Sequence, residues 1–248
     1  MAAILGSRSV LGLPQSPAVD PADNNTLNRQ QDTPNRLPNN VKSFYDAHKP
    51  GNCPKTLAGG FRIKEGGATV YAYCEDQGVI YLHGPDRFVD MDIDCDGDNS
   101  QGGNCANDPS GLSITAFRDE VRKYGIRDLD ANKHPYVVFG NDLGFDPIQF
   151  GLKPLSVMAV VCNSKLHYGI WGDINGDTLT GEASISLGDL CFPEETLNGN
   201  KGHGKADVLY IGFPGAKPSS KWAWKAGNAR DFEASIKAEG DRLIQKLS

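Results

Sequence analysis

Two carboxylates, Asp173 and Glu182, lie on either side of a turn-rich loop in the second half of the chain. Each adjoins a run of residues typical of a β-strand, residues 165–171 upstream and residues 182–187 downstream. Side chains alternate between the two faces of a strand, so Trp171 and Asp173 share a face if the upstream strand continues. Glu182 lies on the polar face of the downstream strand. We therefore expect Asp173, Trp171 and Glu182 to face one groove.

Two acids beside an aromatic ring suit the hydrolysis of a glycosidic bond. One carboxylic acid protonates the departing oxygen, and a second carboxylate activates water or attacks the sugar. The two groups must have different environments, so that one stays protonated while the other is ionised. The alternative is that Asp173, Asn175 and Asp177 are turn residues and that Glu182 is a surface acid, because Asp and Asn favour turns. Spacing alone favours this alternative.

A resemblance to a known family changes that balance. The stretch YGIWGD at 168–173, followed by GEASISL at 181–187, resembles the signature of the fungal chitosanases of glycoside hydrolase family 75. Further stretches agree in consistent order over roughly residues 43–215: FVDMDIDCDG at 88–97, HPYVVFGN at 134–141, KPLSVMAVVC at 153–162 and DVLYIGF at 207–213. The resemblance implies a secreted endo-chitosanase that acts with inversion on chitosan, a cationic polysaccharide. It places the catalytic pair on Asp173 and Glu182 and leaves open which is acid and which is base.

The order of predicted elements favours a mainly β fold. The 29 glycines and 15 prolines among 248 residues indicate many turns. Helical periodicity occurs at 113–124, which ends at Gly125, and at 229–247. This pattern predicts a closed or nearly closed β-barrel with peripheral helices. By analogy with the family, we expect a six-stranded barrel of the double-psi kind. The predicted strands are 67–73, 78–83, 87–93, 135–140, 154–162, 165–171, 182–187 and 207–213.

The chain divides into two parts by composition. Residues 1–42 are rich in Pro, Asn, Gln and Asp, and we expect a flexible tail or an added leader. Residues 43–248 form the predicted catalytic domain. Six cysteines without a CxxC or Cys/His pattern fit a secreted, disulfide-bonded protein better than a zinc site. Six cysteines can pair in 15 ways, and we favour Cys95 with Cys105 because they bracket a short loop.

Six aspartates lie between positions 86 and 98, with only Arg87 to offset their charge. Three interpretations stay open: a groove for a cationic sugar, a calcium site, or a solvated acidic loop. The sequence does not fit an EF-hand, because Gly103 stands at the twelfth position of the loop, where a bidentate Glu belongs. Asp92 and Asp94 share a strand face, which makes them the candidate substrate-binding residues together with Trp171. For Trp171, packing in the core is the alternative.

Other classes of function find little support in the sequence. A formal net charge of −6 gives no basic surface for nucleic acid, and no apolar stretch is long enough to span a membrane. We expect a monomer with no cofactor and no metal ligands. The competing hypothesis is a non-catalytic carbohydrate-binding or calcium-stabilised wall protein on a similar barrel, which would need no acid held protonated near neutral pH.

Overall fold

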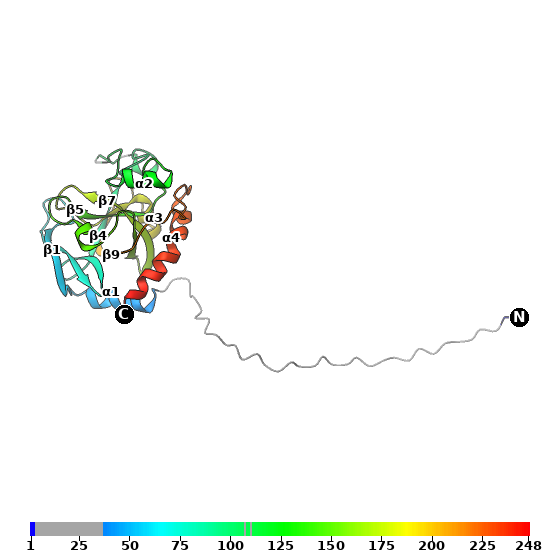
Figure 1. The fold of residues 1–248 in the computed structure, drawn as a ribbon, viewed down its shortest axis with the longest axis horizontal. Helices are drawn as coiled ribbons and strands as arrows, with labels where there is room; N and C mark the ends of the chain where they lie inside the picture. The colour runs from blue at the N-terminus through cyan, green and yellow to red at the C-terminus, as the bar shows by residue number, and fades with distance from the viewer. Residues whose placement is uncertain (3–36, 107, 110) are drawn as a thin grey trace, which may run out of the picture. The chain divides into compact units, whose positions relative to one another are not determined.

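The structure is a computed structural model that describes residues 1–2, 37–106, 108–109 and 111–248 (Figure 1). Residues 1–33 and 34–248 form separate units, and the second unit is described here. The predicted tail lies mostly outside the described residues. The first helix of the second unit, α1 (Asn39–His48), begins four residues before the predicted domain boundary at 43.

The described part of the chain is mainly β, as predicted. Its strands form one sheet in the order β1-β2-β3-β9-β4-β8-β5-β7-β6, and β9 also pairs with β6. The strands from β9 to β6 in this order therefore form a closed cycle, in which each strand pairs with two others of the cycle. The strands are β1 (Lys55–Phe61), β2 (Tyr71–Asp76), β3 (Val79–His83), β4 (Val89–Asp94), β5 (Tyr136–Asn141), β6 (Val157–Cys162), β7 (Lys165–Asn175), β8 (Glu182–Ser184) and β9 (His203–Gly212).

Helices lie around the strands (Figure 1). The C-terminal helix α4 (Ala229–Leu243) packs against β7 and β6. Among the described residues, none of the helices combines the length and the apolar character of a membrane span. The other helices after α1 are η1 (Gly103–Cys105), α2 (Arg118–Val121), η2 (Arg122–Tyr124), η3 (Pro147–Phe150), α3 (Ile185–Cys191), α4 (Ala229–Leu243) and η4 (Ile244–Lys246).

Each of the eight predicted strands overlaps a strand of the structure, with one correction and one omission. The run 182–187 is a strand only to Ser184, because the Ser184 hydroxyl accepts a hydrogen bond from the backbone N–H of Leu187 and caps helix α3. Strand β1 was not predicted. It lacks a clear alternation because it is largely exposed, contains two glycines and is interrupted by bulges where it pairs with β2.

The two predicted helices have different outcomes. The C-terminal helix is confirmed, with Phe232, Ile236 and Leu243 buried on one side. The prediction for 113–124 is wrong in its first half, since helical structure begins only at Arg118. The backbone N–H groups of Thr115 and Ala116 donate instead to the carboxylates of Asp128 and Asp173, respectively. These hydrogen bonds keep the segment out of a helix.

All six cysteines are paired, as Cys53–Cys74, Cys95–Cys105 and Cys162–Cys191. The favoured pair, Cys95 with Cys105, is confirmed. A disulfide stabilises a fold chiefly by restricting the unfolded chain. The Cys95–Cys105 bond begins one residue after β4, so it also fixes the loop that carries the end of the acidic run.

A close approach between β5 and β7 lies directly beside the candidate acid Asp173. A Cβ atom on Gly172 would lie 2.5 Å from Cβ of Tyr136 and 2.8 Å from a methyl group of Leu129. A rotamer change cannot relieve a contact this short to the Cβ atom of a buried side chain, because Cβ does not move when the side chain rotates. Only glycine therefore fits at position 172.

Replacing Gly172 with alanine should overpack this contact and lower the free energy of unfolding by about 1–3 kcal/mol. Thermal unfolding followed by circular dichroism measures the change. Gly176→Ala is the matched control from the same region of the chain, because nothing lies within 4 Å of a Cβ atom there. An unchanged melting temperature for Gly172→Ala would contradict the described packing.

Candidate active site

The register of four strands brings acids from distant parts of the chain into one row. Asp92 of β4 is paired with Glu182 of β8, and Glu182 is paired with Val138 of β5. Val138 is in turn paired with Asp173 of β7. Paired residues on neighbouring strands point to the same side of a sheet. Because strands lie about 4.8 Å apart, the backbones at Asp173 and Glu182 are about 10 Å apart across β5.

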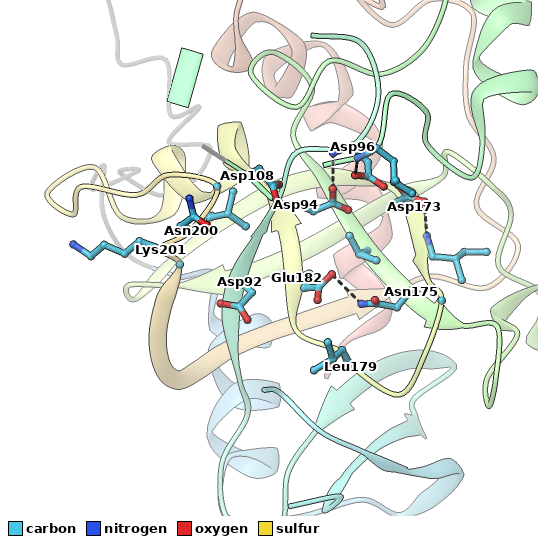
Figure 2. Close-up of a pocket in the computed structure, with 17 residues that line it drawn as sticks. Asp92, Asp94, Asp96, Asp108, Asp173, Asn175, Leu179, Glu182, Asn200 and Lys201 are labelled. Carbon is cyan, nitrogen blue, oxygen red and sulfur yellow. Dashed lines mark hydrogen bonds between the residues drawn. The ribbon is translucent and has the colours of Figure 1, made fainter. Parts of the chain in front are cut away.

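The row opens into a groove of about 460 Å³ (Figure 2). Asp173 and Glu182 both line it, as do the predicted substrate-binding residues Asp92 and Asp94. The prediction that the two candidate acids face one groove therefore agrees with their positions. The residues lining the groove are Asp92, Ile93, Asp94, Asp96, Asp108, Leu112, Val138, Asp173, Ile174, Asn175, Gly176, Leu179, Glu182, Gly199, Asn200, Lys201 and Gly202; below, this is called the acidic groove.

Asp173 is a buried carboxyl group with unequal oxygens. Its side chain is 4% exposed. Oδ1 accepts hydrogen bonds from the backbone N–H groups of Ala116 at 2.9 Å and Ile174 at 2.8 Å. Oδ2 is buried and has no hydrogen-bond partner among the described residues. Burial, followed by the charge of Asp94, raises the pKa of Asp173 well above its ordinary value, although the two N–H donors oppose the shift.

Glu182 lies at the start of β8, where its carboxyl group meets Asn175 from the end of β7. Its Oε2 accepts a hydrogen bond of 2.9 Å from Nδ2 of Asn175 (Figure 2). Burial and then the charge of Asp94 raise the pKa of Glu182 to about 8, while the bond from Asn175 lowers it. A carboxyl group with this pKa is present in both protonation states near neutral pH.

Asp94, Asp96 and Asp173 form a cluster in which one oxygen of each lies within 4.8 Å of the others. Burial raises the pKa of Asp94 to about 6 and that of Asp96 to about 7, and the charge of Asp94 adds to the second shift. The Tyr136 hydroxyl donates to Oδ1 of Asp94 at 3.2 Å and to the backbone oxygen of Asp96 at 3.0 Å. Three oxygens at this spacing can hold a cation or share protons. The basic residue lining the groove, Lys201, extends away from the cluster (Figure 2).

Trp171, the third member of the predicted site, does not line the groove. Its side chain is fully buried and packs edge-on against Phe117, with the ring centroids 4.7 Å apart. The indole N–H donates to the backbone oxygen of Asp173 at 3.0 Å. No face of the ring is open to a sugar, so the alternative of core packing describes Trp171 better. The indole hydrogen bond holds the backbone of Asp173 in place.

The alternative that the 173–182 loop is only a turn describes Asp177 but not Asp173. Oδ1 of Asp177 accepts from the backbone N–H of Leu179 at 2.5 Å, and Oδ2 pairs with Arg62 at 2.9 Å. These are the contacts of a turn residue. The acidic run divides in the same way, since Asp86 and Asp98 pair with Arg87 and Arg127 outside the acidic groove.

The sequence analysis missed Asp96, Asn175 and Tyr136 as members of the site. Asp96 belonged to the recognised acidic run, yet it follows β4 and reaches the groove only through the loop closed by Cys95–Cys105. Asn175 was noted only as a turn residue. Tyr136 lies in the stretch at 134–141 that carried part of the family resemblance, and that stretch was the available signal.

Comparison with known proteins identifies the family. The model of the fungal chitosanases of glycosyl hydrolase group 75 matches residues 91–246. The chain belongs to this family. It is 56% identical over 218 residues to an endo-chitosanase of Aspergillus fumigatus, a match that covers 85% of this chain and 91% of that protein. It is 53% identical over 223 residues to endo-chitosanase B of Aspergillus oryzae, with the same coverage.

A more distant relative matches only in part. Endo-chitosanase C of Aspergillus oryzae is 41% identical over 165 residues, which span 64% of this chain and 39% of that protein. The resemblance inferred from the sequence motifs is confirmed. The protein is a member of a glycosidase family, and the groove described above lies within the matched region.

Replacing Asp94 with asparagine should move the pH–activity profile to lower pH by about one unit. The charge of Asp94 raises the pKa of both Asp173 and Glu182, so its removal lowers both values. If these two groups set the two limbs of the profile, both limbs move to lower pH. Asparagine keeps an oxygen for the hydrogen bond from Tyr136. The measurement is kcat/KM for hydrolysis of a soluble chitosan as a function of pH.

Asp98→Asn is the control for this prediction, because Asp98 pairs with Arg127 at 2.6 Å and does not line the groove. Its profile should stay where the unaltered protein has it. A profile of Asp94→Asn that keeps its position, with only KM raised, would mean that Asp94 acts on the substrate alone and not on the two acids.

Proposed function

We propose that this protein is an endo-acting chitosanase that hydrolyses β-1,4 glycosidic bonds of chitosan, with Asp173 and Glu182 as the acid–base pair. The observation that carries the proposal is the row formed by β4, β8, β5 and β7. It aims both carboxyl groups into one groove, and burial raises the pKa of each. The names of the relatives, endo-chitosanases over most of the chain, support the same activity.

The free oxygens of the two acids define the proposed proton transfers. In Asp173, Oδ1 is held by two backbone N–H groups, so Oδ2 is the atom that gives or takes a proton. In Glu182, Oε2 is held by Asn175, which leaves Oε1 for the same purpose. One group protonates the glycosidic oxygen while the other removes a proton from the attacking water. The charge of Asp94 raises the pKa of both Asp173 and Glu182, so the two carboxyl groups together retain protons near neutral pH.

We propose that hydrolysis proceeds with inversion of the anomeric carbon. An inverting glycosidase needs room for water between one carboxyl group and the sugar, which corresponds to carboxyl groups about 6.5–9.5 Å apart. Backbones about 10 Å apart, with a third strand between them, are compatible with this separation. A nucleophilic mechanism would require the groups at about 5–5.5 Å.

The charge of the groove supports chitosan as the substrate. Six of the residues that line it are acidic, and one is a lysine. The amine of a glucosamine unit is a weak base that is protonated in mildly acidic solution, where the groove attracts the polycation through those of its carboxyl groups that are ionised. The competing proposal of a non-catalytic wall protein explains the charge equally well. It gives no reason for two carboxyl groups of raised pKa to face each other across β5.

We propose residues 43–248 as the catalytic domain. We also propose that the closed cycle of six strands is a barrel of the double-psi kind. Secretion is supported by the three disulfides, since such bonds persist in oxidising surroundings. We propose a monomer that acts without a cofactor.

Asp173→Asn and Glu182→Gln should each lower kcat on chitosan by about 10²–10⁴-fold, since each removes a proton-transfer group. Both changes keep the size of the side chain, so the melting temperature should hold. Release of reducing sugar measures the rate. Asp177→Asn, in the same loop but bonded to Arg62, is the control and should keep most activity. Retained activity in either of the first two variants would remove that residue from the proposed pair.

The unaltered protein should cleave highly deacetylated chitosan and leave chitin and carboxymethylcellulose nearly intact. The reason is that only chitosan carries the positive charge that the groove attracts, and added salt should weaken its binding. Asp92→Asn should raise KM more than it lowers kcat, as loss of ground-state binding does. Equal rates on chitin and chitosan would refute the electrostatic account, whatever the outcome for the catalytic pair.

A further inference from the structure

A second hollow, of about 550 Å³, lies next to the acidic groove. Ile174 lines both, so the two hollows are neighbours that share this residue. The second hollow is built chiefly by the segment that follows β5, together with residues of β1, and none of its other residues belongs to the site described above. Its lining includes Asp142, Phe145, Asp146, Gln149, Phe150 and Ile174; we call it the distal hollow.

An aromatic stack ends at this hollow. Tyr73 and Phe145 are stacked with ring centroids 4.1 Å apart, and Phe145 and Phe150 are stacked at 5.2 Å. Tyr73 is fully buried, whereas Phe150 is 37% exposed. The inner face of the Phe150 ring is therefore covered by Phe145, and its exposed part borders the hollow. A half-covered ring fixed from behind is a platform for another flat, partly apolar ring such as a pyranose.

The distal hollow carries negative charge without a compensating cation. Asp142 and Asp146 are both exposed, and no Lys, Arg or His is among the described residues that line the hollow. One oxygen of Asp146 accepts a hydrogen bond from the backbone N–H of Ile148 at 2.9 Å, which fixes the side chain and leaves the other oxygen to face a ligand. Such a surface attracts a ligand that combines an apolar ring face with an ammonium group.

The position of the hollow relative to the acids is fixed by hydrogen bonds. The backbone N–H of Asp142 donates to the backbone oxygen of Asn175 at 2.9 Å. Asn175 in turn donates from its side chain to Glu182. Asn141 is anchored from the other side, because it accepts from the buried Tyr73 hydroxyl at 2.7 Å and donates to the backbone oxygen of Asp177 at 2.8 Å. The segment is therefore part of the same rigid framework as the candidate acids.

We propose that the distal hollow is a further subsite, which binds glucosamine units of the polysaccharide chain that occupies the acidic groove. Phe150 stacks on a sugar ring, and Asp142 and Asp146 face its ammonium groups. The proposal rests on the proposed function, since it takes the ligand to be the same cationic chain. The closeness of the two hollows, which share Ile174, and the matching charge select this occupant. A consequence is that short oligomers fill the acidic groove alone, whereas long oligomers also gain the contacts of the distal hollow.

Phe150→Ala tests the proposal on pure glucosamine oligomers of two lengths. Its kcat/KM should fall about fivefold to tenfold on a long oligomer of eight or so units and stay unchanged on the shortest oligomer cleaved, because only the former reaches the ring. Phe150→Trp should restore the rate on the long oligomer. Ile148→Ala is the matched control, since Ile148 is 46% exposed on the same turn and does not line the hollow.

Equal rates of Phe150→Ala and the unaltered protein on the long oligomer would overturn the subsite, as would an equal loss on both lengths. Asp142→Asn serves as a second variant if Phe150→Ala melts early, and its loss on the long oligomer should shrink as salt is added. Calorimetric titration with the long oligomer gives the same comparison without turnover when Glu182→Gln, which the proposed function makes inactive, is added to both proteins. If the unaltered protein cleaves no oligomer, the proposed function is refuted. In that case, weaker binding of the long oligomer to Phe150→Ala than to the unaltered protein would still support the subsite.

Discussion

Repulsion among buried carboxylates is the constraint on which the rest of this structure depends. Asp94, Asp96 and Asp173 place oxygens within 4.8 Å of one another, and Glu182 feels the charge of the same Asp94. Burial strengthens the repulsion, because few solvent dipoles remain to screen it. Since fully ionised acids at this spacing would be costly, the native state keeps protons on some of them. The raised pKa values are therefore the electrostatic consequence of the way the strands are paired.

The surroundings of the acids are built to hold this arrangement. Two backbone N–H groups fix one oxygen of Asp173, Asn175 fixes one oxygen of Glu182, and the Tyr136 hydroxyl bridges Asp94 and the backbone of Asp96. Gly172 allows Tyr136 to approach β7, and the Cys95–Cys105 bond limits the loop that carries Asp96. In the proposed complex, a cationic chain would relieve the repulsion among these acids, which would link the stability of the site to the binding of that chain.

Local sequence patterns predicted eight of the nine strands in the described residues, but they did not predict what covers them. The predicted strand at 165–171 stopped short of Asp173, which was expected on it only if the strand continued, and β7 does continue through Asn175. The two-residue period put Trp171 on the face of Asp173, and that failed because the pairing of β7 with β5 shifts register between these two residues. Their partners Val137 and Val138 are neighbours on β5 and point to opposite faces. The indole ring therefore lies on the other face, where it packs against Phe117. The predicted helix at 113–124 failed for a related reason, since Asp128 and Asp173 take the N–H groups of its first turn. Both errors arise from contacts between residues far apart in sequence. The pairing of Asp92 with Glu182 also depends on a parallel register that no local pattern contains.

The titration of the carboxyl groups themselves tests this account most directly. Carbon-13 NMR of the Asp and Glu carboxyl signals, assigned with the Glu182→Gln variant, measures the pKa of Glu182 in the free protein and with a bound glucosamine oligomer that is too short to be cleaved. The account predicts a pKa of about 8 in the free protein and a lower value in the complex, because ammonium groups stabilise the ionised form. A pKa near 4.5 that does not respond to the oligomer would show that neither burial nor the charge of Asp94 acts on this group, and it would contradict the central claim.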